Sequence, residues 1–316
     1  MNRSSKQHMQ VVRHDVRFDS GETYCSAWLF LPVGVERPPV VVLGHGLGAI
    51  REMRLDAFAE RFAAQGIAAL AFTYRYFGDS GGQPRQLMSV PRQLEDWEAA
   101  LNFVKSRQDL DDSRLAVWGS SFGGGHSITM ASRHPELRAA VAQCPFSDGL
   151  ASATAQGLIA GMKGSMRLLP LAMRDFAARR KGRAPVTVPI AGDPGQLALM
   201  STHDALNGYL KLVPKGSEFV NHVAARVIPE IVRYRPGLSA HKIKCPILFC
   251  VSETDTVTPP GRTLVLARRA PRGDIKCYNA GHFDFYLGAV FEQLVSDQSR
   301  FLVEHLVPTT PHPISH

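Results

Sequence analysis

The sequence feature that most constrains the fold is the pentapeptide Gly-Ser-Ser-Phe-Gly at residues 119–123, which follows the apolar run 115–118 and precedes a helix-like segment. In a Gly-X-Ser-X-Gly elbow the chain turns so sharply from strand to helix that the serine is strained and the residues two before and two after it must lack side chains. Gly119 and Gly123 meet that demand around Ser121. We therefore predict a strand, a turn and a helix here, with Ser121 as a candidate nucleophile at the turn.

Strand-like and helix-like segments alternate along most of the chain. Two β-branched and aromatic runs, at residues 11–18 and 23–31, flank a turn signal and predict an opening antiparallel hairpin. Further strands are predicted at residues 40–43, 68–72, 115–118, 139–143, 247–251 and 275–278, and helices at 54–65, 94–104, 263–269 and 290–302. Such alternation predicts an α/β fold whose mostly parallel sheet is covered by helices on both faces.

The alternation lapses between residues 146 and 244. Met-rich apolar helices there precede a Pro/Gly-rich stretch at 185–195 and then more helix. An insertion of that length is too long for a plain loop, so we expect a mainly helical cap over the strand ends. The predicted organisation is therefore a core of residues 1–146 and 243–307, a cap at 147–242 and a flexible tail at 308–316.

The helices expected in the cap carry a stripe of apolar side chains. Its members are Leu158, Ile159, Met162, Met166, Leu168, Leu169, Met173 and Phe176. Such a stripe either lines an acyl pocket or, more commonly, packs the helices on one another and on the sheet. Met162 and Met166, together with Tyr209 further along the cap, are the candidate substrate-binding residues.

A serine hydroxyl is a poor nucleophile at neutral pH, so it needs an imidazole to take its proton and a carboxylate to orient and stabilise that imidazole. Asp255 lies just beyond the predicted strand 247–251, and His282 follows the last predicted strand. Both would project from the carboxyl ends of sheet strands, the edge on which the elbow presents its serine. The candidate catalytic residues are Ser121, Asp255 and His282.

Other residues compete for these roles. Glu253 lies two positions before Asp255, and Asp148 follows the strand after the elbow, from where a carboxylate can also reach the histidine. Asp284 is expected to start a helix instead. The remaining histidines near the predicted motifs are expected to be structural or exposed: His45, His126 and His241.

Acyl transfer also requires preorganised N–H groups that stabilise the tetrahedral oxyanion. The amide of Phe122, directly after the nucleophile and at a helix start, is one candidate. The amide of Leu47 is the other, because it lies in the Gly-His-Gly-Leu-Gly turn at 44–48, whose glycines let the backbone approach a substrate closely.

The net charge of +8 and the pI near 9.4 could indicate an anionic partner, although most basic residues are dispersed among acidic ones. The one dense basic cluster, at residues 179–183, lacks interleaved aromatic residues, so nucleic-acid binding is not expected. Docking of an acidic carrier protein or of the phosphates of coenzyme A is the option that we retain. The alternative is a charged surface loop.

The five cysteines show neither a C-x-x-C nor a Cys/His metal spacing, so we expect no disulfide framework and no metal site. No apolar run reaches the roughly 18 residues of a membrane span, and residues 1–10 lack the apolar region of a secretory signal. A cytoplasmic protein without membrane contact is therefore predicted. The glycine-rich phosphate and dinucleotide motifs are also missing, so no cofactor is expected.

Several of these motifs together resemble the α/β-hydrolase superfamily. The resemblance is carried by His45-Gly46, by residues 78–82 and 119–125, by Asp255 with the Val and Pro that follow it, and by Gly281-His282. It implies an eight-stranded sheet, with Ser121, Asp255 and His282 as a catalytic triad. Within the superfamily, residues 45–52 with Tyr74-Arg75 and Pro84-Arg85 are similar to dienelactone-hydrolase-like esterases and to hydrolases and polyketide acyltransferases of secondary metabolism.

These expectations converge on a cofactor-free serine hydrolase that cleaves an ester or thioester of a moderately apolar acyl group through an acyl-enzyme on Ser121. Transfer of the acyl group to an alcohol, or cleavage of a peptide or carbon–carbon bond, would use the same three residues. A hydrolase-like receptor that binds a small molecule without turnover is the non-enzymatic alternative. The sequence leaves the substrate, the acyl acceptor and the oligomeric state open, a homodimer included.

Overall fold

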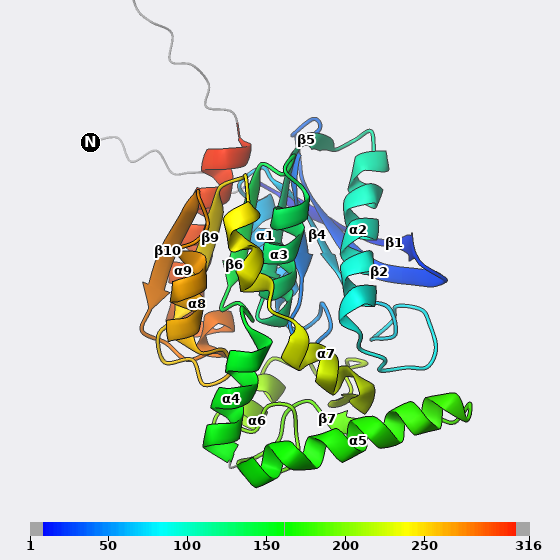
Figure 1. The fold of residues 1–316 in the computed structure, drawn as a ribbon. Coiled ribbons are helices and arrows are strands. Elements are labelled where there is room, and N and C mark those ends of the chain that lie inside the picture. The colour runs from blue at the N-terminus through cyan, green and yellow to red at the C-terminus, as the bar shows by residue number, and fades with distance from the viewer. Residues whose placement is uncertain (1–8, 161, 308–316) are drawn as a thin grey trace, which may run out of the picture.

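A single eight-stranded sheet forms the centre of the computed structural model, which describes residues 9–160 and 162–307 but not the side chains of 156–166. The strand order is β1-β2-β4-β3-β5-β6-β9-β10 (Figure 1). The strands are β1 (Val11–Ser20), β2 (Thr23–Pro32), β3 (Pro39–Gly44), β4 (Ala68–Phe72), β5 (Asp111–Ser120), β6 (Ala139–Gln143), β9 (Ile247–Ser252) and β10 (Gly273–Tyr278). The predicted fold class is thus confirmed.

The sheet is parallel except at β2, which pairs antiparallel with both β1 and β4. The β1–β2 hairpin is therefore the one predicted at the start of the chain. The inner strands β3, β4, β6 and β9 are buried along their whole length, which explains why they appear in the sequence as continuous apolar runs.

Helices cover both faces of the sheet, as predicted. On one face α1 contacts α9, whereas α2, α3 and α8 lie on the other (Figure 1). These helices span α1 (Leu55–Ala63), α2 (Val90–Ser106), α3 (Phe122–Arg133), α8 (Pro260–Ala267) and α9 (Gly288–Leu306). The sandwich places the carboxyl ends of β3, β5, β6, β9 and β10 at one edge of the molecule.

Some strands are longer than their apolar patterns predict. β5 begins at Asp111, four residues before the predicted start, because Asp111 pairs with Pro39 at the rim of the sheet across a shift in register, and residues 111–114 are partly or fully exposed. An apolar run marks only the buried part of a strand, so hydrophobicity alone misses such rims.

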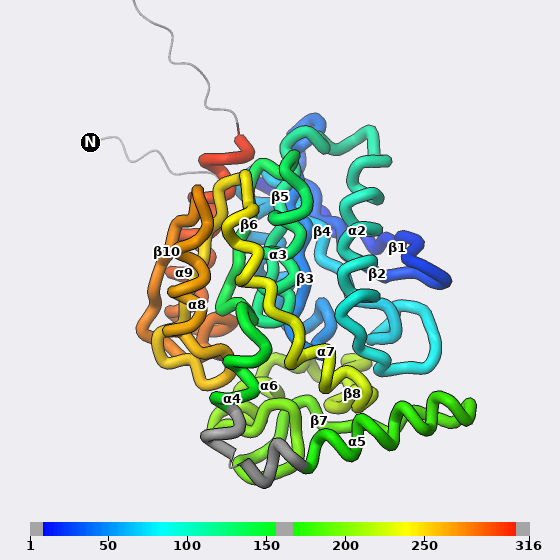
Figure 2. Tube along the Cα trace, in the orientation of Figure 1, coloured from blue at the N-terminus to red at the C-terminus, as the bar shows by residue number. Residues whose placement is uncertain are grey.

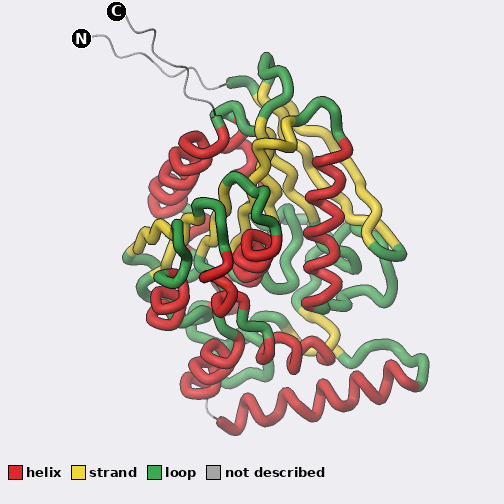
Figure 3. The backbone as a smooth tube through the Cα atoms, turned by 45° about the horizontal axis from the view of Figure 1, so that its top comes forward, coloured by secondary structure: helices red, strands yellow, loops and turns green. Residues whose placement is uncertain are grey.

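The segment 147–242 lies against the carboxyl edge of the sheet in every view (Figures 1, 2 and 3). It contains α4 (Gly149–Ala160), α5 (Met162–Arg180), β7 (Thr187–Pro189), α6 (Ala205–Leu210), β8 (His222–Ala224), the 3-10 turns η1 (Ala225–Val227) and η2 (Pro236–Lys242), and α7 (Ile228–Arg233). The small β7–β8 sheet was not predicted, because strands of three residues leave no readable alternation. We call this segment the cap segment; its status as a separate unit stays a prediction.

Within the described part of the chain, no helix combines the length and the apolar character that a membrane span requires. The five cysteines are free thiols, and all but Cys277 are buried. No group of three or more potential metal-ligating side chains occurs among the described residues. The predicted tail at 308–316 lies outside the described residues.

Candidate active site

Ser121 occupies a strained turn between β5 and α3, with φ of 56° and ψ of −117°. Both flanking positions must be glycine, because no space is left there for a side chain. A Cβ atom on Gly119 would overlap the carbonyl group of Gly123, and one on Gly123 would overlap the carbonyl oxygen of Gly44. The backbone contacts therefore explain the glycine pattern that singled out this serine in the sequence.

A chain of two hydrogen bonds connects Ser121 to His282 and His282 to Asp255. The Ser121 Oγ lies 3.0 Å from Nε2 of His282, whose Nδ1 lies 2.7 Å from Oδ2 of Asp255. Because Nδ1–H donates to the carboxylate, Nε2 of the neutral ring is free to accept the serine proton. The structure thus brings the three predicted residues together at the carboxyl ends of β5, β9 and β10.

The carboxylate of Asp255 is itself fixed by neighbouring donors. Its Oδ1 accepts hydrogen bonds from the amides of Val257 at 2.8 Å and Thr258 at 2.7 Å, and its Oδ2 accepts one from the Thr258 hydroxyl at 2.9 Å. These bonds hold the acid in the orientation that the imidazole requires.

The His282 ring is almost fully buried, with 2% of its surface exposed. Burial is the largest single influence and would lower the pKa of His282, but the charge and hydrogen bond of Asp255, together with the neighbouring Cys144, raise it, and the pKa lies well above 6.5. The ring therefore has a high affinity for the serine proton, and its charged form is stabilised once the proton has moved.

The competing carboxylates lie elsewhere. Asp148 is buried but is held by Arg235 and Arg262 at 2.9 and 2.8 Å. Burial would raise the pKa of Asp148, and these two guanidinium groups together lower it below its ordinary value. Glu253 is exposed, and Asp284 starts the 3-10 turn η3 (Asp284–Tyr286), as predicted.

The other histidines have structural surroundings or are exposed. His126 is buried, with its ring nitrogens 2.8 Å from the Tyr234 hydroxyl and 3.0 Å from Gln93 Oε1. His45 packs edge-on against Tyr74, with ring centroids 4.5 Å apart. Burial lowers the pKa of His45 and of His126 to about 3, so both are neutral near pH 7. His241 is exposed, and these placements agree with the prediction.

Both predicted oxyanion donors lie next to the nucleophile. Phe122 is the first residue of α3, so its amide has no intrahelical acceptor. Leu47 and Phe122 line the same cavity as Ser121. The loop before Leu47 comes very close to the elbow, since a Cβ on Gly46 would lie 3.2 Å from the Cβ of Ser121.

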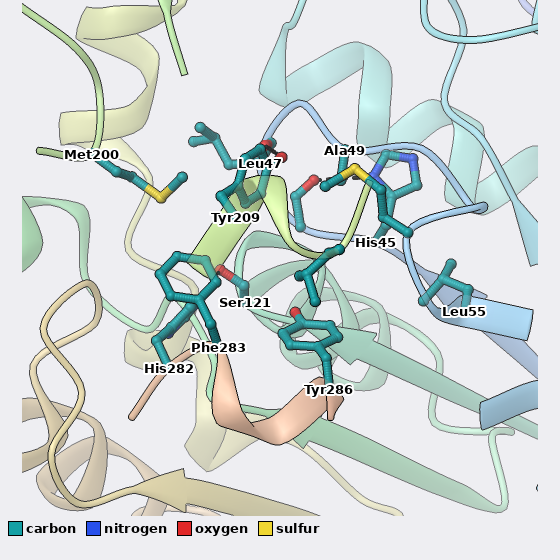
Figure 4. A pocket seen from close by; sticks show the side chains of 13 residues that line it. His45, Leu47, Ala49, Leu55, Ser121, Met200, Tyr209, His282, Phe283 and Tyr286 are labelled. Carbon is teal, nitrogen blue, oxygen red and sulfur yellow. Dashed lines mark hydrogen bonds between the residues drawn. The ribbon is translucent and has the colours of Figure 1, made fainter. Parts of the chain in front are cut away.

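Two cavities meet at Ser121. The larger measures about 370 Å³, within the range of small-molecule sites, and separates the elbow from the cap segment. Its walls are mostly apolar: Leu47, Phe122, Phe146, Ala153, Leu168, Leu169, Leu199, Met200, Ile228, Pro229, Ile231, Val232 and Val257, with Ser121, Ser152 and Arg233. The smaller measures about 20 Å³, room for one water molecule, and is lined by His282, Tyr209 and His45 among others (Figure 4).

The predicted substrate-binding residues have different placements. Tyr209 lines the small cavity, and its hydroxyl donates a 2.5 Å hydrogen bond to the carbonyl of Leu47, so it supports the oxyanion loop. Figure 4 shows Tyr209 beside Leu47, above Ser121. The side chains of Met162 and Met166 lie outside the described residues.

Of the predicted apolar stripe, the side chains of Leu158, Ile159, Met162 and Met166 lie outside the described residues, and the other four divide into two parts. Leu168 and Leu169 line the large cavity, as one of the two predicted roles requires. Met173 and Phe176 are exposed by 64% and 41%, so the prediction is wrong for them. They lie further along α5, beyond the part that faces the elbow.

The contribution of α7 to the large cavity was not predicted. Ile228, Ile231 and Val232 have the spacing of one helical face and all line it. That spacing was visible in the sequence, but a helix of six residues gives a weak signal. Met200, which reaches the cavity from a loop, gave no signal at all.

Comparisons with known proteins point to one family. A family model described as serine aminopeptidase, S33, matches residues 36–283. The quorum-quenching protein AidA of Acinetobacter baumannii (strain MDR-ZJ06) is 47% identical over 294 residues, which cover 93% of this chain and 95% of that protein. A thiohydrolase of Eupenicillium brefeldianum is 25% identical over 290 residues, which cover 87% and 88%.

A solved structure agrees in fold. The crystal structure of the α/β hydrolase GrgF from Penicillium sp. sh18 matches with a TM-score of 0.77 and 24% identity, over 94% of this chain and 100% of that one. The sheet order, the family match and this likeness confirm the resemblance to α/β hydrolases.

Proposed function

The chain belongs to the serine aminopeptidase S33 family of α/β hydrolases, and from this premise we propose that it hydrolyses an ester or thioester of a moderately apolar acyl group through an acyl-enzyme on Ser121. The observation that carries the proposal is the hydrogen-bonded series Ser121, His282 and Asp255, whose serine opens onto an apolar cavity of about 370 Å³.

In the acylation step, Ser121 Oγ attacks the substrate carbonyl while Nε2 of His282 takes its proton. Asp255 remains ionised and stabilises the imidazolium that forms. The proton then passes from Nε2 to the leaving alcohol or thiol, the bond between acyl carbon and leaving group breaks, and the acyl group stays on the serine.

The negative charge that develops on the carbonyl oxygen would be stabilised by the amides of Phe122 and Leu47. Phe122 is held at the start of α3, where the helix dipole adds to the effect. Leu47 is held through its own carbonyl by Tyr209. Both donors are thus fixed before substrate binds.

Deacylation by water is the outcome that we propose. The small cavity beside Ser121 and His282 measures about 20 Å³, which suits one water molecule. His282 would take a proton from that water as it attacks the acyl carbon. The large cavity also reaches Ser121, so transfer of the acyl group to an alcohol is the second candidate.

Aminopeptidase activity is less well supported. An aminopeptidase must hold the positively charged amino terminus of its substrate, and a carboxylate is the usual partner for such a charge. No Asp or Glu side chain of the described residues lines either cavity at Ser121. An uncharged acyl chain fits these walls better.

The leaving group of the proposed substrate can be a thiol. The similarity to a thiohydrolase supports a thioester, and coenzyme A or an acidic carrier protein would then bring the acyl group. Arg179 and Arg183 line a surface groove of about 560 Å³, and neither forms an ion pair with a described residue. We propose this groove as the anion-binding surface for such a partner.

The test uses an activated short-chain ester and a fluorophosphonate. Ser121→Ala should lose about four orders of magnitude in kcat/KM, while Ser120→Ala, at the neighbouring position, should retain activity. A fluorophosphonate should add its mass to the wild type and to Ser120→Ala, but not to Ser121→Ala. Equal turnover by wild type and Ser121→Ala would refute the proposal, and an unlabelled wild type would favour a receptor without turnover.

A further inference from the structure

Helix α5 presents an apolar stripe to solvent. Its members Leu169, Met173 and Phe176 are exposed by 57%, 64% and 41%. At 3.6 residues per turn, the three side chains lie within about 60° of one another around the helix axis. Phe176 is also the only exposed Phe, Tyr or Trp side chain of the described residues. Single exposed apolar residues are common on protein surfaces, but a contiguous stripe marks an interaction site.

The stripe is exposed although α5 is firmly attached on its other face. Ala172 is buried there, and Asp175 is fully buried in an ion pair with Arg226. Figures 1 and 3 show α5 along the outer edge of the cap segment, with no other element on its far side. The described fold therefore leaves the apolar face of a well-anchored helix uncovered.

Basic side chains flank the stripe. Arg174 lies on one side of it and Arg179 on the other, and Arg180 follows one turn after Phe176. All three arginines are exposed, and none forms an ion pair with a described residue. The only acidic residue of α5 is Asp175, whose charge is already neutralised. The surface thus has an apolar centre and a positive rim.

This pattern favours a layer of anionic lipid as the partner. A bilayer interface takes up apolar side chains to a depth of about 5–10 Å, and its negative headgroups attract Lys and Arg. The aliphatic stems of the flanking arginines can lie in the apolar layer while their guanidinium groups reach the headgroups. A second copy of this chain would instead bring two positive rims together, which repel each other.

We propose that α5 binds the surface of an anionic lipid bilayer and places the cap segment on it. The sequence predicted no membrane contact, because no apolar run is long enough to span a bilayer. A helix that lies in the interface requires no span, since only one of its faces has to be apolar.

The stripe also reaches the large cavity. Leu169 lines this cavity and is exposed, so the cavity opens to the outside beside the stripe. Leu168, one position earlier, lines it as well. An apolar acyl chain would then pass from the bilayer interface to Ser121 without crossing bulk water. This route rests on the proposed function, whereas the attachment to lipid does not.

The experiment measures co-sedimentation of the full chain with vesicles of phosphatidylcholine, alone or mixed with phosphatidylserine. The wild type should bind the mixed vesicles about tenfold more tightly than the neutral ones, and added salt should reduce the difference. Met173→Glu combined with Phe176→Glu should weaken binding to the mixed vesicles about tenfold or more. Val265→Glu, at an exposed apolar position of α8, is the matched control and should bind like the wild type.

The positive rim is tested separately. Arg174→Ala combined with Arg180→Ala should weaken binding to the mixed vesicles about tenfold at low salt. Arg268→Ala combined with Arg269→Ala, which removes the same charge at the end of α8, should have no effect. Thermal unfolding followed by circular dichroism should give the wild-type midpoint for all these variants, because the substituted side chains are exposed.

Absence of binding to the mixed vesicles, or equal binding by the Met173→Glu, Phe176→Glu double variant and by Val265→Glu, would overturn the inference. Binding of soluble polyglutamate that the double variant retains would assign the surface to an acidic protein instead, and a solution dimer that the double variant separates would assign it to a second copy. If vesicles are bound but no ester is cleaved, the proposed function fails and the lipid surface stands. If esters are cleaved without vesicle binding, only the lipid surface fails.

Discussion

The elbow and the cap segment face each other across the large cavity, and they are built in opposite ways. Around Ser121 there is no spare space, because backbone carbonyls occupy the places where side chains of Gly119 and Gly123 would lie. Across the cavity, the cap segment leaves apolar side chains of α5 exposed, Leu169 by 57% and Met173 by 64%. We therefore expect the chemistry to depend on the core and the choice of substrate to depend on the cap segment.

This contrast does not mean that the cap segment is poorly folded. Asp175 of α5 is fully buried and binds Arg226 through two side-chain hydrogen bonds of 2.7 and 2.9 Å. The same carboxylate accepts the amides of Arg226 and Val186, so it connects α5 with two other stretches of the segment.

The largest effect is expected on the core side, from Asp255→Asn. The amide cannot stabilise the imidazolium and favours the wrong tautomer, so kcat should fall by about 10³ to 10⁴ without a change in thermal stability. Glu253→Gln, two residues away and exposed, is the matched control and should leave kcat unchanged. A greater loss in the control would move the acid role to Glu253.

The pH profile of the same variant sharpens this prediction. His282 must be neutral to accept the serine proton, and its pKa is raised above 6.5, so kcat/KM of the wild type should rise with pH through a midpoint above 6.5. Without the charge of Asp255, the largest of the influences that raise this pKa is lost, while burial still lowers it. The midpoint of Asp255→Asn should therefore move to lower pH, and an unchanged midpoint would contradict the assignment.

A smaller effect, on stability, is expected from Gly119→Ala. The added methyl group has to displace backbone, which should lower the free energy of unfolding by about 3 kcal/mol or more in urea titrations. Gly261→Ala is the control, because nothing lies within 4 Å of its Cβ position and it belongs to helix α8. Similar stability of the two variants would show that the elbow is less tightly packed than described.

On the cap side, Leu168→Phe should change substrate preference rather than rate or stability. The larger ring shortens the large cavity, so kcat/KM should fall about tenfold for long acyl esters and stay nearly constant for acetyl esters. Met173→Phe, on the exposed side of the same helix, should leave both unchanged. Equal effects of the two variants would remove α5 from the acyl site.

The smallest effect is expected at the basic groove. Arg179→Ala combined with Arg183→Ala should raise KM for an acyl-coenzyme A thioester about threefold at low salt, and the difference should shrink as salt is added. A simple activated ester with the same acyl group provides the comparison, and its KM should not change. A change for both substrates would assign the arginines to the fold of the cap segment.

The core could be predicted from the sequence because its demands are local and steric. The glycines around Ser121 and the positions of Asp255 and His282 after strands follow from the turn and from the shared edge of a parallel sheet. Tyr209 shows the limit of such inference. Tyr209 lines the small cavity at Ser121, and its role as a substrate contact stays a prediction, but no pattern indicated that its hydroxyl binds the carbonyl of Leu47, 162 residues away in the sequence.

The cap segment could be predicted only in outline. Its helical content and its position over the strand ends follow from composition and length, but its cavity wall depends on how α4, α5 and α7 come together. Met200 reaches the cavity from a loop without any periodic pattern.

The short helix α6 has a consequence for how a substrate enters. Gly208 packs directly on Phe283, next to His282, and Tyr209 binds the carbonyl of Leu47, whose amide is the proposed oxyanion donor. Asp204, just before the helix, accepts a 2.6 Å hydrogen bond from Thr256, next to the acid. The short helix α6 therefore contacts three loops of the candidate active site. Moving α6 aside to admit a substrate would break these contacts. Entry of the substrate past α4 and α5 would leave α6 in place.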